Sequence, residues 1–228
     1  MRRYDAVFLD VDGTLLWVDL DIEGYVRDLK PYATNGSLTV KQAEGPIWES
    51  LRRHINENIN YPTEEELAAF RRENARGVAD FLGLDAPAEV LDEVMNRHIL
   101  YNPYPEAEAV MEELKEIGIP LYVVSNWDVA LATVLDDLGW TRYMSGIVAS
   151  AKIGSEKPDD TIFEEALRAA GLPRGRVVHV GNDPISDIQG AAAAGIDAIL
   201  IDREGGIEAP KAVEILPDLC GVPPLVQG

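Results

Sequence analysis

The sequence predicts an α/β fold in which a parallel sheet carries helices on both faces and a helical insert follows the first strand. Two observations support this prediction. Short, unbroken apolar runs, which are typical of strands buried on both faces, alternate with segments of helical periodicity, and this alternation indicates βαβ units. Residues 18–101 interrupt the alternation, because they carry helical patterns and no convincing buried strand.

The expected strands are the apolar runs of the chain. One opens the sequence and the others follow the insert, the third being the weakest: Ala6–Leu9, Ile119–Val124, Gly146–Ala149, Val177–Val180 and Ala198–Ile201. Between them, apolar residues recur at helical spacing in three segments: residues 106–117, Phe163–Ala170 and Ile188–Ile196. Gly195 is the expected end of the last helix, since glycine adopts the left-handed conformation that closes a helix.

The insert is expected to consist of amphipathic helices. Thr63, with Glu66 three residues later, forms a capping box, which is a typical helix start. We interpret two apolar stripes as core-facing: Leu67, Phe70, Val78, Phe81 and Leu82, then Val90, Leu91, Val94, Met95 and Ile99. The expected domains are therefore a core of residues 1–17 and 102–228 and a helical domain of residues 18–101.

The chain is strongly acidic. It has 40 Asp and Glu residues against 20 Lys and Arg, which gives a formal net charge of −20. Nucleic acids and anionic membranes need a Lys/Arg surface to replace counterions, so neither is an expected partner. A small anionic ligand stays compatible with this charge, because a few local donors outweigh a distant negative surface.

Cysteine usage and hydropathy favour a cytoplasmic protein. Cys220 is the only cysteine and cannot form an internal disulfide, as expected in a reducing compartment. The apolar stretch near the N-terminus ends at Asp10, too early for a secretion signal. No later segment approaches the length of a membrane span.

Two carboxylates directly follow the first predicted strand, within Asp10-Val11-Asp12-Gly13-Thr14. Residues two apart in an extended segment point to the same side, so Asp10 and Asp12 are expected to share one face. They lie at the carboxyl end of a strand, where open α/β sheets bind ligands. Their mutual repulsion favours a nearby Mg²⁺ ion, which prefers oxygen ligands. A solvated turn or a helix cap is the alternative, and the preceding apolar strand disfavours it.

Polar groups also follow the next strand along the chain. Ser125 and Asn126 stand at its end, where their hydroxyl and amide groups can donate to a phosphate oxygen. Capping of the following helix is an alternative, and the two roles can coexist. Lys157 lies in a loop before a helix, and Pro158 restricts it to extended geometry. Taken alone, Lys157 is more simply interpreted as a surface lysine.

The strand Val177–Val180 places further acids at the same edge of the sheet. Asp183 is the acid best placed for a metal ion. Asp187 either caps the following helix or holds Lys157 through a charge-assisted bond. His179 lies within the strand, and we interpret it as a histidine of the core or of the layer behind the site, not as a ligand.

The order of these motifs resembles the haloacid dehalogenase-like hydrolase superfamily over nearly the whole chain. Four segments match its motifs: Asp10–Thr14, Val123–Asn126, Lys157–Asp159 and Gly181–Asp187. The insert between the first two resembles the helical cap of the subgroup that contains small-molecule phosphatases, phosphomutases and dehalogenases. The resemblance therefore implies a Rossmann-like core with a small α-helical cap.

The resemblance also implies a Mg²⁺-dependent phosphatase that hydrolyses a small phosphomonoester. Asp10 would attack phosphorus and form an aspartyl-phosphate, while Asp12 would protonate the leaving group and then activate water. Mg²⁺ would be held by Asp10, the Asp12 backbone carbonyl and Asp183. The remaining motif residues would bind the phosphoryl oxygens: Ser125, Asn126 and Lys157.

The fourth motif departs from the commonest family pattern. Many members carry Gly-Asp where this chain has Gly181-Asn182-Asp183. Other members carry two adjacent acids there and use the second for the metal, which places Asp183 in that role by resemblance.

Asp12 distinguishes the branches of the family. Dehalogenases of this fold resemble the phosphatases but lack the second acid. Retention of Asp12 therefore favours phosphoryl transfer to water or, in a phosphomutase, to a sugar hydroxyl. A binding or regulatory module without turnover is a third alternative, and both a monomer and a dimer are compatible with the sequence.

Substrate choice is expected to lie mostly in the insert. Its basic residues can contact a second anionic group of the substrate, although solvated helix faces and local ion pairs are the simpler interpretation: Arg52, Arg53, His54, Arg71 and Arg72. Trp17, where the chain enters the insert, either contacts substrate or covers a hinge.

Overall fold

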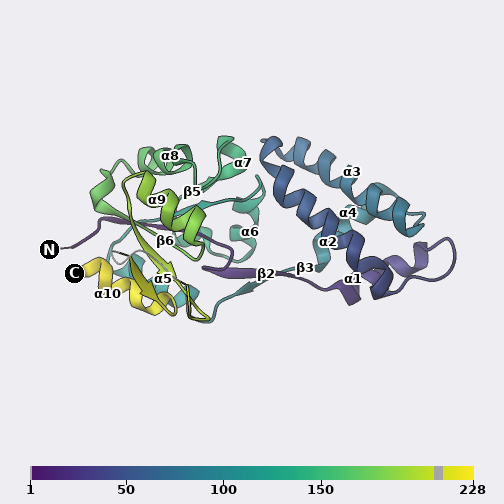
Figure 1. Cartoon of the computed structure of the whole chain (residues 1–228), viewed down its shortest axis with the longest axis horizontal. Coiled ribbons are helices and arrows are strands. Elements are labelled where there is room, and N and C mark those ends of the chain that lie inside the picture. Colours follow the sequence, from purple (N-terminus) through teal and green to yellow (C-terminus); the bar gives the residue numbers. More distant parts are fainter. Residues whose placement is uncertain (1, 208–212) are drawn as a thin grey trace. The chain divides into compact units, whose positions relative to one another are not determined.

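The computed structural model describes residues 2–207 and 213–228. The chain forms two compact units, coloured by sequence in Figure 1. The core unit comprises Met1–Trp17 and Pro103–Gly228, and the insert unit comprises Val18–Asn102. No helix among the described residues is both long and apolar enough to cross a membrane.

The core unit contains a parallel sheet of six strands within the described part of the chain, in the order β5-β4-β1-β6-β7-β8. The strands are β1 (Ala6–Leu9), β4 (Leu121–Ser125), β5 (Met144–Ala149), β6 (Val177–Gly181), β7 (Asp197–Ile201) and β8 (Glu214–Leu216). This arrangement confirms the predicted α/β fold. It also places β1 between β4 and β6, so the three motif-bearing strands are neighbours. The edge strand β8 was not predicted, because its three residues form no buried apolar run.

Helices cover both faces of this sheet (Figure 1). On one face, Phe8 and Tyr122 of the sheet pack against Phe163 and Ala166 of α8. In Figure 1, α5 and α10 lie on the opposite face. The helices of the core unit are α5 (Ala107–Glu116), α6 (Leu131–Asp137), α7 (Ser150–Ile153), α8 (Asp160–Ala170), α9 (Gly190–Ala193) and α10 (Val222–Gln227), with the turns η3 (Thr141–Tyr143), η4 (Arg174–Arg176), η5 (Pro184–Gln189) and η6 (Leu219–Gly221).

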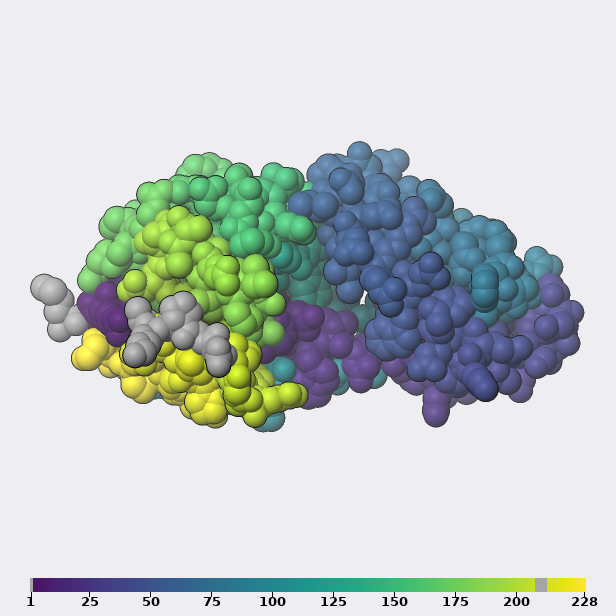
Figure 2. All heavy atoms as spheres, in the orientation of Figure 1, coloured from purple at the N-terminus to yellow at the C-terminus, as the bar shows by residue number. Residues whose placement is uncertain are grey.

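The two ends of the chain lie side by side in the core unit. The Arg3 backbone N–H donates to the Val226 carbonyl at 3.0 Å, and Figures 1 and 2 show the N-terminal segment beside the C-terminal one. The N-terminal segment therefore extends from β1 to α10.

The helix predicted over Ile188–Ile196 is divided in the structure. The π-helical turn η5 comes first and α9 follows it. The Asp183 carboxylate starts η5 by accepting the N–H groups of Ile185 and Ser186, so the helical segment begins earlier than its apolar residues indicate. It ends as predicted at Gly195, which has a φ of +71°.

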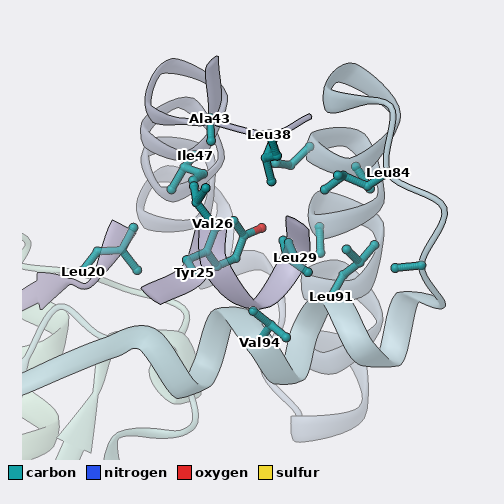
Figure 3. Packing of buried hydrophobic residues seen from close by; sticks show 14 residues of the cluster. Leu20, Tyr25, Val26, Leu29, Leu38, Ala43, Ile47, Leu84, Leu91 and Val94 are labelled. Atoms are coloured by element: carbon teal, nitrogen blue, oxygen red, sulfur yellow. The ribbon is translucent and has the colours of Figure 1, made fainter. Parts of the chain in front are cut away.

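The insert unit is helical, with one short pair of strands. Its helices and turns are α1 (Ile22–Leu29), η1 (Lys30–Tyr32), α2 (Val40–Glu57), η2 (Asn58–Asn60), α3 (Glu64–Leu82) and α4 (Ala88–His98). The strands β2 (Leu16–Leu20) and β3 (Ile99–Pro103) cross its first and last boundaries in the sequence. β2 and β3 pair with each other, and their largely exposed residues explain why neither was predicted. The helices pack around a buried cluster shown in Figure 3, with Tyr25 and Leu29 of α1 facing Ile47 of α2 and Leu91 of α4.

Helix α3 confirms one prediction and corrects another. The capping box is present, because Thr63 Oγ1 accepts the Glu66 N–H at 3.3 Å and Glu66 Oε2 accepts the Thr63 N–H at 3.2 Å. Phe81, however, was wrongly placed in the core, since it is 76% exposed. At about 100° per residue, the position three after Val78 falls beside the buried stripe, and Leu82 takes its place against the core.

Candidate active site

Asp10 lies at the carboxyl end of β1, with its carboxylate almost fully buried. Its backbone N–H donates to the Val180 carbonyl of β6 at 2.9 Å, which fixes the residue at the edge of the sheet. Oδ1 accepts from Ser125 Oγ at 3.0 Å and from Lys157 Nζ at 2.7 Å. Oδ2 accepts a longer contact of 3.4 Å from Thr14 Oγ1. The structure therefore brings three of the predicted site residues together: Asp10, Ser125 and Lys157.

Lys157 is buried. The interpretation as a surface lysine, which is the simpler one when Lys157 is considered alone, is therefore wrong. Its ammonium lies between two carboxylates, 2.7 Å from Asp10 Oδ1 and 2.5 Å from Asp187 Oδ1. Of the two alternatives for Asp187, the structure has the bond to Lys157. This bond closes a buried chain from Asp187 through Lys157 to Asp10.

The Asn126 side chain holds the backbone of Lys157. Its Nδ2 donates to the Lys157 carbonyl at 2.8 Å, and its Oδ1 accepts the Lys157 N–H at 2.7 Å. Both ends of the amide are thus engaged by one residue. Asn126 therefore fixes the position of the Lys157 backbone relative to the end of β4.

The buried charges shift one another's pKa values. Burial raises the pKa of Asp10, the Asp187 charge adds to this, and Lys157 opposes it. Burial alone would lower the pKa of Lys157, but the two carboxylates outweigh burial and raise it. Burial alone would raise the pKa of Asp187, but Lys157 and His179 outweigh burial and hold it well below its ordinary range. Lys157 therefore stays protonated and Asp187 ionised at neutral pH.

The two remaining predicted acids, Asp12 and Asp183, are exposed. Asp183 Oδ1 accepts the N–H groups of Ile185 at 2.8 Å and Ser186 at 2.6 Å. Among residues 2–207 and 213–228, no group of three or more His, Cys, Asp or Glu side chains is arranged to hold a metal ion. The assignment of Asp12 and Asp183 to a metal site remains a prediction.

Sequence reasoning missed two residues that brace the turn after β1. Thr14 Oγ1 lies 3.2 Å from Asn182 Oδ1 and 3.4 Å from Asp10 Oδ2, so its single O–H is shared between these two acceptors. Asn182 lies so close to Gly13 that a Cβ at Gly13 would sit 2.2 Å from its Nδ2. Gly13 also has a φ of +79°, so the turn requires glycine for two reasons. The Gly-Thr pair indicates a sharp turn, but nothing in the sequence indicates its contact with Asn182.

His179 is completely buried in β6, as predicted for a histidine of the core. Its Nε2 lies 2.9 Å from Asp187 Oδ1. Its ring meets the edge of Phe163, with the ring centroids 5.1 Å apart. His179 therefore extends the chain of buried polar groups by one residue.

The predicted local ion pairs of the insert are present for Arg53 and Arg71. Arg53 Nε lies 3.2 Å from Glu57 Oε1, and Arg53 Nη2 lies 3.0 Å from Glu73 Oε1. Arg71 Nε lies 3.6 Å from Asp92 Oδ1. In the core unit, Trp17 is 41% exposed, and the centroids of the Trp17 and Tyr104 rings are 5.1 Å apart.

Comparison with known proteins places these residues in a family. The model for haloacid dehalogenase-like hydrolases matches residues 4–195. The glyceraldehyde 3-phosphate phosphatase of Methanothermobacter thermautotrophicus is 32% identical over 213 residues, which cover 87% of this chain and 86% of that protein.

Solved structures share the fold. The 2-haloacid dehalogenase from Pseudomonas syringae pv. Tomato DC3000 is 25% identical, with a TM-score of 0.69 over 97% of both chains. The protein YfnB from Bacillus subtilis, solved bound to magnesium, is 20% identical, with a TM-score of 0.63 over 100% of both chains.

Proposed function

Because the chain belongs to the haloacid dehalogenase-like hydrolase family, we propose that it is a Mg²⁺-dependent phosphatase that hydrolyses a small phosphomonoester through an aspartyl-phosphate on Asp10. The observation that carries this proposal is the arrangement at Asp10. A buried carboxylate at a strand end, held by the Ser125 hydroxyl and the Lys157 ammonium, is a preorganised nucleophile beside two donors for phosphoryl oxygens.

The proposed reaction has two steps. In the first, a carboxylate oxygen of Asp10 attacks phosphorus, the P–O bond to the leaving group breaks, and Asp12 gives that oxygen a proton. In the second, Asp12 takes a proton from water, the water oxygen attacks phosphorus, and the bond to Asp10 breaks to release phosphate. Asp12 is exposed, as a group that exchanges protons with substrate and water must be.

Two residues are proposed to bind the phosphoryl group, and a third is proposed to hold one of them in place. Ser125 and Lys157 already donate to Asp10, so a phosphoryl group attached there comes within their reach. Asn126 contributes by holding the Lys157 backbone in place. The positive charge of Lys157 stabilises the charge that develops on the transferring group.

The proposed ligands of Mg²⁺ are all oxygen atoms, the donor type that this ion prefers. This ion is usually bound by one or two carboxylates, with water and substrate phosphate in its other positions. The Asp10 carboxylate, the Asp12 backbone carbonyl and the Asp183 carboxylate are the oxygens we propose to hold it. When bound, Mg²⁺ neutralises charge on the phosphoryl oxygens and on Asp10.

The proposed substrate is a small phosphorylated metabolite. A relative that matches 87% of this chain is named for glyceraldehyde 3-phosphate, a triose phosphate. Retention of Asp12 supports a phosphatase over a dehalogenase, because an alkoxide leaving group needs a proton.

Hydrolysis of a generic aryl phosphate tests the proposal. Wild-type protein is expected to release phosphate slowly with Mg²⁺ present, and EDTA or Asp10→Asn is expected to abolish this. Asp137→Asn, which changes an exposed acid of α6, is the matched control and should retain wild-type turnover. A wild-type protein inert toward a broad panel of phosphoesters would refute the proposal, and isomerised sugar phosphate with little free phosphate would identify a phosphomutase instead.

A further inference from the structure

His179 is a buried ionisable side chain for which the proposed reaction has no direct use. Its Nε2 lies 2.9 Å from Asp187 Oδ1, whereas its Nδ1 has no hydrogen-bond partner among the described residues. The carboxylate of Asp187 can only accept, so Nε2 carries the proton of the bond. A proton on Nδ1 would leave a buried N–H group unsatisfied, which is costly, so the neutral Nε2–H form fits this site.

Asp187 receives three donors from three different segments. Oδ1 accepts from both His179 Nε2 and Lys157 Nζ, and Oδ2 accepts the Asp183 backbone N–H at 2.9 Å. His179 and Lys157 therefore share one oxygen atom. The hydrogen bond from the histidine N–H partly offsets the negative charge on this oxygen. It therefore weakens the electrostatic attraction between Lys157 and Asp187.

Lys157 stands between two competing carboxylates. An ammonium group has three N–H donors, and the contacts with Asp10 and Asp187 use two of them. The third donor is the one that can reach a phosphoryl oxygen. How far the ammonium leans toward Asp187 therefore determines how much of its charge acts on a phosphoryl group at Asp10.

We propose that His179 is a positioning residue for Lys157: by donating to the oxygen of Asp187 that also binds the lysine, it keeps the ammonium available to the phosphoryl group. This inference rests on the proposed phosphatase function. It predicts that loss of the His179 donor strengthens the hold of Asp187 on Lys157. Inorganic phosphate, the product, should then bind roughly tenfold more weakly.

Two substitutions separate the donor from the ring. His179→Phe keeps a flat ring against Phe163 and removes the donor. His179→Gln keeps an amide N–H at the reach of Nε2. With Mg²⁺ present, we expect His179→Phe to raise the inhibition constant of inorganic phosphate and the KM of an aryl phosphate about tenfold, with a smaller change in kcat. His179→Gln should stay within about twofold of wild type, because its amide N–H can donate to the same oxygen. Wild-type phosphate affinity in His179→Phe, or equal losses in both variants, would overturn the inference.

A double-mutant cycle tests the route through Asp187. In an Asp187→Asn background, adding His179→Phe is expected to cause no further loss of phosphate affinity, because the shared oxygen no longer carries the charge. Additive losses would show that His179 acts through packing alone and would overturn the inference.

The imidazole nitrogens of the wild-type protein provide a measurement that needs no variant to fold. Nitrogen NMR should show the neutral Nε2–H form for His179, and inorganic phosphate with Mg²⁺ should shift the Nε2–H proton as Lys157 moves. An Nδ1–H form, or a resonance that does not respond to bound phosphate, would refute the role of His179. A wild-type protein that neither binds phosphate nor releases it from any ester would instead refute the proposed function itself.

Discussion

Asp10 combines two properties that conflict in a folded protein. Its carboxylate is buried, which disfavours the ionised form, and yet the proposed reaction needs that ionised form as nucleophile. Lys157 offsets part of this cost, but Asp187 competes for the same ammonium. The pKa of Asp10 is therefore raised overall, so its ionisation destabilises the fold while preparing the chemistry.

Asp10→Asn is expected to stabilise the metal-free protein while abolishing turnover. A folded pKa above the unfolded value means that stability is greatest at low pH and is lost as pH rises through the folded pKa. At neutral pH the ionised carboxylate therefore costs stability, and the neutral amide removes that cost. Thermal melts in EDTA should show a Tm a few degrees above wild type. A lower Tm for Asp10→Asn would show that the pair with Lys157 outweighs burial.

Asp183→Asn is expected to weaken Mg²⁺ binding about tenfold, because it removes one of the two carboxylates proposed to hold the ion. The amide oxygen retains an acceptor for the N–H groups of η5. Asp137→Asn, which changes an exposed acid of α6, is the control and should bind Mg²⁺ like wild type. Isothermal titration with MgCl₂ measures both. Unchanged Mg²⁺ affinity in Asp183→Asn, or an equal loss in Asp137→Asn, would contradict the role of the Asp183 carboxylate.

The site residues differ in how far the sequence predicts them. Asp10 and Ser125 each end an apolar run, and strand ends at one sheet edge must converge, so their meeting follows from the pattern. The partners of Asn126 and His179 depend on where loops return to the sheet. No local periodicity encodes those returns.

At the scale of elements, buried apolar runs gave reliable predictions. The strand Ala6–Leu9 has the predicted bounds because all of its side chains are buried. The capping box at Thr63 was predictable for a different reason, since its partners lie three residues apart in sequence. The prediction that Phe81 faces the core was wrong, because Phe81 and Leu82 near the end of the helix both fit the spacing of the apolar stripe and only Leu82 packs against the core.

Helix α1 places a tyrosine in the core of the insert unit, and this makes the insert sensitive to alkali. Burial raises the pKa of Tyr25 to about 12, above the unfolded value of about 10. The stability due to its neutral phenol is complete below pH 10 and is lost as pH rises through about 12. Tyr25→Phe should therefore shrink the fall in Tm between pH 8 and about 11. Circular dichroism measures these melts, and a fall in Tm as large in Tyr25→Phe as in wild type would contradict this account.

At the scale of the whole molecule, the division into a core unit and an insert unit follows from where the βαβ alternation stops. The sheet order could be anticipated only in part. Motif chemistry predicts that the carboxyl ends of β1, β4 and β6 lie close together. The short strand β8 forms through pairing with β7, which the sequence does not show.

The net charge of −20 acts on the whole chain. Self-repulsion among surface carboxylates destabilises a compact state, and salt screens it. We expect the Tm in EDTA to rise by several degrees when NaCl increases from about 0.02 M to about 0.5 M. A Tm that falls over this range would show that ion pairs such as Arg53–Glu73 outweigh the repulsion.

The most direct test of the account is to look for the phosphoryl group on the protein. An aryl phosphate leaves without a proton, so Asp12→Ala should still complete the first step with Mg²⁺ present, but it lacks the base for the second. After acid quench, peptide mass spectrometry should find one phosphoryl group on the Asp10 peptide, and none when Asp10→Asn is added. A phosphoryl group on another residue, or phosphate release from Asp12→Ala with no modified peptide, would contradict the account.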